Sequence, residues 1–187
     1  MKTSSFLFLT LLVVATTAYD RNAAVTYAYK YVHSPNHKCG TGAYKCSPYG
    51  YFGGERCGYK SQGGDCANFV SQCLIAGGHP KLTKGGCRGS EFCGAEVGAA
   101  KLSNCLPSSY DWTSKCGYRL APPANIKAGD VLVYFSGAGC SGDAHAVLVT
   151  KVSGGRAKIT CHSSEQKDVD YDYQKNSKPY YKWIHHK

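Results

Sequence analysis

Gly63-Gly64-Asp65-Cys66-Ala67-Asn68-Phe69-Val70-Ser71-Gln72 is the most informative run of the sequence, because a glycine-rich loop turns into a helix within it. A cysteine in the first turn of a helix meets unpaired backbone N–H groups and the positive end of the helix dipole, which favour the thiolate. The two glycines let a substrate backbone approach the sulfur closely. We therefore predict that Cys66 is a nucleophile and that Gly64 and Asp65 form the substrate-binding and oxyanion part of the loop, with the Asp65 side chain itself structural.

The helix that begins at this cysteine is expected to span residues 66–76, because an apolar stripe runs along it and Gly77, Gly78 and Pro80 form a stop signal. A second amphipathic helix is expected at residues 20–32, with Asp20 as its cap. Its stripe consists of Ala24, Tyr27, Ala28 and Tyr31.

Three apolar runs near the end of the chain predict strands at residues 130–135, 145–152 and 156–162. Between the helix at residues 66–76 and these strands, only a short helix near residues 91–102 is expected. Helices followed by an antiparallel sheet indicate an α+β domain.

The first 18 residues have the pattern of a cleavable signal peptide, with Lys2 followed by an apolar run and a small-residue cleavage site. Residues 19–187 then form one catalytic domain, which we expect to be a secreted, soluble monomer, or one retained in a lysosomal or phagosomal lumen. No later segment is apolar over the ~20 residues that a membrane span needs.

The chain has 11 cysteines, an odd number. In an oxidising compartment, five disulfide bridges and one reactive thiol at Cys66 are the simplest arrangement. A bridge to another molecule, or a buried structural thiol at Cys66, would also account for the odd count.

A nucleophilic cysteine needs a base, most often histidine, and a group that orients it. If Gly154 and Gly155 form a two-residue hairpin turn, Val147 faces His162, and His145 and His162 then share one face of the sheet as diagonal neighbours. A three-residue loop would reverse this parity. A zinc site is the rival use of one cysteine and two histidines. The two C-terminal histidines, His185 and His186, are expected to be exposed.

Several motifs together resemble a known family, the putative amidase domain related to NlpC-like and CHAP-like cell-wall hydrolases. They are the segment 19–28, the run around Cys66 that ends at residues 76–78, Gly129-Asp130-Val131, His145, and Thr160-Cys161-His162-Ser163. The resemblance implies a papain-like fold, in which the nucleophile helix packs on an antiparallel sheet that extra cysteines reinforce. It also implies catalytic roles for Cys66 as nucleophile, His145 as base and His162 as the third polar group.

The formal charge of +10, or +9 without Lys2, favours an anionic partner. With the motif, it predicts a hydrolase of amide bonds in peptidoglycan or another anionic cell-wall polymer, with no cofactor or metal and no role in nucleic-acid binding. The bond would join muramic acid to the stem peptide or lie within the stem. Two alternatives stay open: a catalytically inert cationic wall-binding or antimicrobial protein on the same fold, and an acyltransferase that uses the same residues.

Overall fold

The structure is a computed structural model that describes residues 18–33, 66–79, 98–108, 112–163 and 165–187. In this part of the chain, the helical elements are α1 (Arg21–Tyr31), α2 (Cys66–Ala76), α4 (Ala99–Cys105) and the short 3₁₀ helix η2 (Leu106–Ser108). The strands are β1 (Trp112–Tyr118), β2 (Val131–Gly137), β3 (Ser141–Ser153), β4 (Arg156–Cys161), β5 (Gln166–Asp170) and β6 (Tyr180–His186). None of the described helices combines the length and apolar character that crossing a membrane requires.

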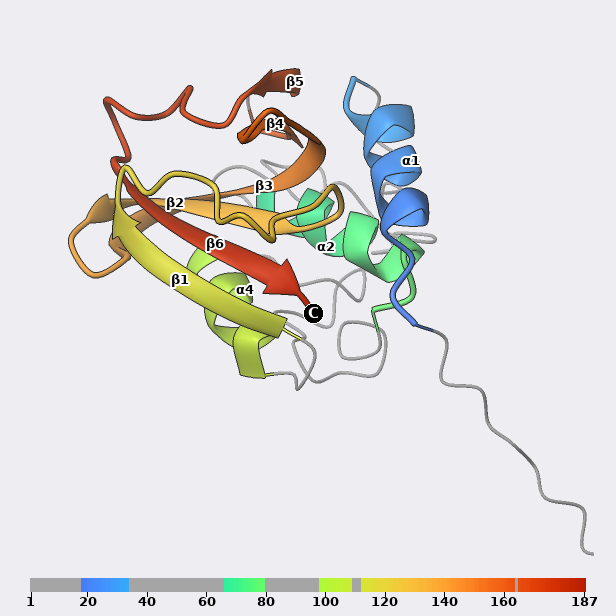
Figure 1. Ribbon diagram of the computed structural model, residues 1–187, viewed down its shortest axis with the longest axis horizontal. Helices are drawn as coiled ribbons and strands as arrows, with labels where there is room; N and C mark the ends of the chain where they lie inside the picture. Colours follow the sequence, from blue (N-terminus) through green and yellow to red (C-terminus); the bar gives the residue numbers. More distant parts are fainter. Residues whose placement is uncertain (1–17, 34–65, 80–97, 109–111, 164) are drawn as a thin grey trace, which may run out of the picture.

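The strands form one antiparallel sheet in the order β1-β6-β2-β3-β4-β5 (Figure 1). Helices α1, α2 and α4 pack on one face of the sheet, where they bury Val131, Val133, Ala146 and Leu148. The opposite face carries a second core around Leu132, Tyr134, Val147 and Trp183. The prediction of an α+β fold in which the Cys66 helix packs on an antiparallel sheet is therefore confirmed.

Both predicted helices form, and α1 lies against α2 in the antiparallel direction. Asp20 caps α1 by accepting a hydrogen bond from the backbone N–H of Ala23 at 3.0 Å. The backbone N–H of Asp20 also donates to the carbonyl of Gly77, just beyond the end of α2. A side chain at Gly77 would collide with Tyr19, since a Cβ there would lie 2.5 Å from the Tyr19 ring. The glycine that ends α2 therefore also contacts the residues that begin α1.

Asp130 ties the two ends of the described chain to the sheet. It is fully buried, forms a salt bridge with Arg21 of α1, and lies 2.8 Å from Nδ1 of His185 in β6. The backbone N–H groups of Lys127 and His186 also donate to its carboxylate. The expectation that His185 is exposed is therefore wrong, because the aspartate of the Gly-Asp-Val motif draws its imidazole inward.

The hairpin between β3 and β4 has the predicted two-residue turn, with positive φ at both Gly154 and Gly155. Next to the turn, Ser153 pairs with Arg156, as that turn requires. The register then shifts between Val149 and Lys151, which leaves Thr150 as an extra residue in β3. Such a β-bulge reverses the faces of all residues beyond it.

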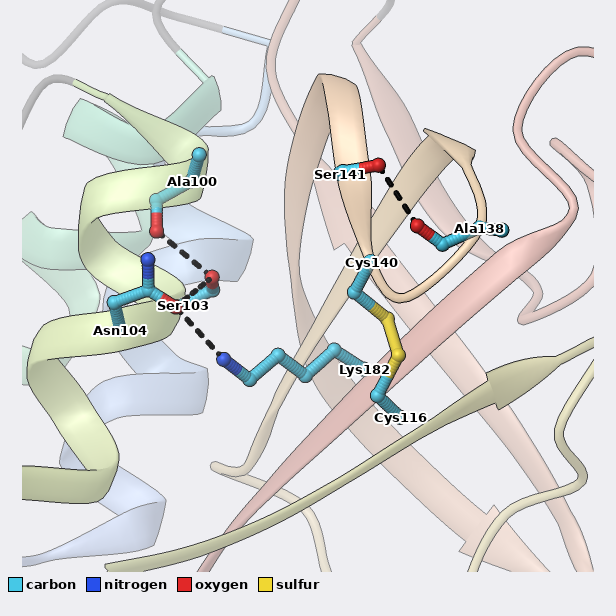
Figure 2. The surroundings of a disulfide bond; sticks show 8 residues. All are labelled: Ala100, Ser103, Asn104, Cys116, Ala138, Cys140, Ser141 and Lys182. Atoms are coloured by element: carbon cyan, nitrogen blue, oxygen red, sulfur yellow. Dashed lines mark hydrogen bonds between the residues drawn. A yellow bond between two sulfur atoms is a disulfide. The ribbon is translucent and has the colours of Figure 1, made fainter.

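A disulfide joins Cys116 in β1 to Cys140, which directly precedes β3, over a sequence separation of 24 residues (Figure 2). Figure 2 also shows Lys182 of β6 reaching α4, where its Nζ donates to Oδ1 of Asn104 at 2.9 Å. These two links hold the β1 edge of the sheet and α4 in place.

The five-bridge prediction is wrong. Cys66, Cys73 and Cys161 are all buried thiols, which leaves eight of the 11 cysteines, enough for four bridges. Cys73 lies in the helix-side core and Cys161 in the second core, so both serve as small apolar residues. An odd number of cysteines in a sequence therefore does not distinguish packed thiols from a reactive one.

Candidate active site

Cys66 is the first residue of α2, as predicted, and it is 8% exposed. The N-terminal end of a helix carries backbone N–H groups with no partner within the helix and a partial positive charge. Both features favour a thiolate at this position. The other thiol of the same helix, Cys73, differs, because complete burial raises its pKa well above the usual value. The helix thus holds one thiol at its N-terminal end and one packed in the core.

His162 follows β4 and lies on the helix side of the sheet. Its imidazole stacks on the ring of Phe69, with 4.0 Å between ring centroids and an interplanar angle of 20°. Phe69 is three residues after Cys66, and residues with this spacing are neighbours on a helix surface. The stacking therefore places His162 beside the first turn of α2.

A backbone carbonyl of α1 orients this histidine. Nε2 of His162 lies 2.8 Å from the carbonyl oxygen of Tyr31, the last residue of α1. Since a carbonyl can only accept a hydrogen bond, Nε2 carries a proton, and Nδ1 is the ring nitrogen at which a proton can be gained or lost. The antiparallel packing of α1 on α2 explains the contact, because it brings the end of α1 to the beginning of α2. The carbonyl of Tyr31 and the ring of Phe69 together fix the orientation of the His162 imidazole.

His145 lies on the opposite face of the sheet. Its Nε2 is 2.8 Å from the hydroxyl of Tyr173, which also lies 3.3 Å from the sulfur of Cys161. Its ring is nearly parallel to that of Tyr134, a residue of the second core. Burial, and to a lesser extent the charge of Lys178, lowers the pKa of His145 to about 4. His145 is therefore a neutral, hydrogen-bonded residue of the second core.

The prediction that His145 and His162 share a face is wrong, and the bulge at Thr150 is the reason. Beyond the bulge, Leu148 pairs with Thr160, so continuing this register places Ala146 opposite His162. Ala146 belongs to the helix-side core, whereas His145 points to the other side. The structure thus brings His162 to the Cys66 helix and separates His145 from it.

The same separation contradicts a zinc site made of Cys66, His145 and His162. Among the residues that the structure describes, no cluster of three or more histidine, cysteine, aspartate or glutamate side chains is arranged to hold a metal ion. The predicted oxyanion residues Gly64 and Asp65 lie outside the described residues.

Sequence reasoning missed three contributors around these histidines. Tyr31 acts through its main chain, which no residue pattern reveals, although the residue itself belongs to the predicted stripe of α1. Tyr173 comes from a turn that follows β5, and its proximity to His145 depends on the fold. Asn68 was visible inside the central motif, but nothing in the sequence shows that its amide points into a buried network.

A structure titled "The crystal structure of Ly7917" is similar, with a TM-score of 0.45 and 15% sequence identity; the match covers 88% of this chain and 62% of that chain. A search of curated proteins found no match. The family model described as "Putative amidase domain" matches residues 18–184, which extend from the start of α1 into β6. The chain therefore belongs to the putative amidase domain family.

Proposed function

We propose that this protein is a secreted cysteine hydrolase that cleaves amide bonds in bacterial peptidoglycan, with Cys66 as the nucleophile. The observation that carries the proposal is the convergence of Cys66 and an oriented histidine at the beginning of α2, in a chain of the amidase family. Membership supports an amidase or hydrolase activity in general. The cysteine mechanism, the substrate and secretion are the parts that need testing.

For the base, the geometry supports His162. It combines a place beside the first turn of α2 with a tautomer that leaves Nδ1 able to accept a proton. The Tyr31 carbonyl then takes the part that an aspartate or asparagine side chain takes in a triad, since it fixes the ring and stabilises its protonated form. The family resemblance instead assigns the base to His145, with His162 as the third group. The two assignments predict different mutant phenotypes.

The reaction would proceed by acyl transfer. The Cys66 proton passes to Nδ1 of His162, and the resulting thiolate attacks the amide carbonyl carbon. The tetrahedral intermediate collapses, the C–N bond breaks, and His162 gives the proton to the leaving amine. A water molecule then attacks the thioester, His162 removes one of its protons, and the carboxylic acid product leaves with the Cys66 thiol restored.

Two features support peptidoglycan as the substrate. The formal charge of +10 favours association with the carboxylates and phosphates of bacterial walls. The motif around Cys66 also resembles that of NlpC-like and CHAP-like wall hydrolases. We propose that the chain is related to these papain-like enzymes. The scissile bond would be the muramoyl-alanine bond or a bond within the stem peptide.

Mass spectrometry of purified peptidoglycan, incubated with the protein expressed without residues 1–18, tests this function. The proposal expects released stem peptides or new amino ends with the wild type and none with Cys66→Ala. Equal product from both proteins would exclude Cys66 as nucleophile. Binding to peptidoglycan without any product would instead support an inert wall-binding protein, and incorporation of an added amine would support an acyltransferase.

A further inference from the structure

The carboxylate of Asp168, in β5, joins α1 to the sheet. Its Oδ1 accepts hydrogen bonds from the hydroxyl of Tyr29 at 2.9 Å and from that of Thr150 at 2.7 Å. Its Oδ2 lies 2.5 Å from Nζ of Lys151. Figure 1 shows the matching arrangement of the elements, with β5 next to the C-terminal end of α1. One side chain thus connects α1, the bulge of β3 and the edge strand β5.

A closed ring of hydrogen bonds links Asp168 to β3 and β4. Because a carboxylate only accepts, the hydroxyl of Thr150 donates to Asp168. The hydroxyl oxygens of Thr150 and Thr160 lie 3.3 Å apart, so Thr160 is the donor of that pair. The backbone N–H of Asp168 in turn donates to the hydroxyl oxygen of Thr160 at 3.3 Å. The ring therefore fixes Asp168 against the end of β4 and against the bulge at the same time.

The backbone of Asp168 is in the left-handed region, with φ at 52°. This conformation costs free energy for any residue other than glycine, and aspartate and asparagine tolerate it best. It persists in proteins where the surrounding contacts hold the residue in place. At Asp168 those contacts are the bonds to Tyr29, Thr150 and Thr160.

The network lies close, in the sequence, to both partners of the contact between His162 and Tyr31. Tyr29 precedes Tyr31 by two residues in the last turn of α1, and Thr160 precedes His162 by two residues in β4. Asp168 accepts from Tyr29 and donates to Thr160. It therefore ties together the two segments that carry the carbonyl and the imidazole of that contact.

We propose that Asp168, acting through Tyr29, is a positioning residue that keeps the Tyr31 carbonyl on Nε2 of His162. The inference rests on the proposed function for the catalytic role of His162. Loss of the bond between Tyr29 and Asp168 releases the last turn of α1 from β5. The Tyr31 carbonyl then no longer stays in place, and the neutral His162 ring carries its proton on either nitrogen.

Three conservative variants isolate this role. Tyr29→Phe removes only the hydroxyl that binds Asp168. Asp168→Asn keeps an oxygen acceptor and tolerates the backbone conformation; it loses the ion pair with Lys151, whose side chain is 60% exposed, so that the pair contributes little. Tyr173→Phe is the matched control, because it removes a tyrosine hydroxyl that binds His145 on the other face of the sheet.

Nitrogen-15 spectra of the histidine rings test the positioning directly. In the Cys66→Ala protein at pH 8, where an imidazole is neutral, a ring protonated only at Nε2 gives two widely separated nitrogen signals. We expect this separation for His162 in that protein and in its Asp168→Asn and Tyr173→Phe derivatives. Tyr29→Phe should bring the two signals closer together, because both tautomers become populated. An unchanged separation in Tyr29→Phe, or an equal loss in Tyr173→Phe, would overturn the proposal.

Kinetics with Cys66 in place give a second readout. Tyr29→Phe should lower kcat for a soluble peptidoglycan fragment by about two- to tenfold, the effect of one lost hydrogen bond. KM should stay nearly unchanged, because the base and not the substrate is displaced. An equal loss of kcat in Tyr173→Phe would overturn the proposal. If the wild type releases no product, the proposed hydrolase fails, while the spectra of the Cys66→Ala protein still decide the role of Asp168.

Discussion

Nε2 of His162 lies 2.8 Å from the main-chain oxygen of Tyr31, so the end of α1 orients the imidazole that stacks on Phe69 of α2. The contact needs α1 to be docked on α2 and on the sheet. Tyr29, two residues before Tyr31, reinforces this docking by donating its hydroxyl to Asp168 of β5 at 2.9 Å. The catalytic proposal thus depends on how α1 is held, in addition to the residues of the motif.

Replacement of the two thiols of α2 should have opposite consequences. Cys66→Ala is expected to abolish hydrolysis and leave the far-UV circular dichroism spectrum and melting temperature nearly unchanged. Cys73→Ala, in the fully buried part of the helix, should retain the reaction but lower stability by about 1 kcal/mol, because it leaves a small cavity. Urea unfolding and the peptidoglycan assay on both variants check this pair. Full activity of Cys66→Ala would disprove its role.

The sequence predicted both α1 and α2 because each has a local signal: an apolar stripe, a cap at Asp20, or the stop at Gly77 and Gly78. It did not predict β1 and β6, whose places in the sheet come from long-range pairing, or β5, which pairs locally with β4. The bulge at Thr150 was equally hidden. One extra residue leaves no recognisable signal in the composition or the periodicity of so short a strand. It nevertheless places His145 in the other core.

The buried His145 should make stability depend on pH. Its folded-state pKa of about 4 lies below the ordinary value of 6.5, so the unfolded chain binds more protons between these values. Stability should therefore fall as pH drops from 6.5 toward 4, by about 3 kcal/mol from this residue. Urea midpoints measured between pH 4.5 and 7 check the slope. His145→Gln, which cannot titrate, should flatten it, and an unchanged slope in that variant would contradict the assignment.

Removal of the Asp130 carboxylate should destabilise the fold strongly. Asp130→Ala would leave the buried ends of Arg21 and His185 without their shared partner, at a cost of about 3–5 kcal/mol. Asp170, whose side chain is 42% exposed, is a matched control, because its pairs with Arg156 and Lys158 lie in solvent. We expect Asp170→Ala to change stability much less than Asp130→Ala does. An equal loss of thermal stability in both variants would argue against this role of Asp130.

The disulfide between Cys116 and Cys140 should contribute about 3 kcal/mol, the value expected for a loop of this length. Serine at both positions removes the bridge without leaving a single reactive thiol. Chemical denaturation of this double variant measures the contribution. A free energy of unfolding equal to that of the wild type would show that the bridge does not constrain the chain.

The most direct test of the central claim, that Cys66 and His162 act as a pair, is the rate of Cys66 alkylation by iodoacetamide against pH, read from the mass of the Cys66 peptide. A thiolate paired with an imidazolium reacts below pH 6, where an ordinary thiol with a pKa near 8.5 does not. The account predicts that His162→Ala suppresses this reaction at low pH and that His145→Ala retains it. Suppression by His145→Ala, with His162→Ala unaffected, would contradict the account and return the role of base to His145.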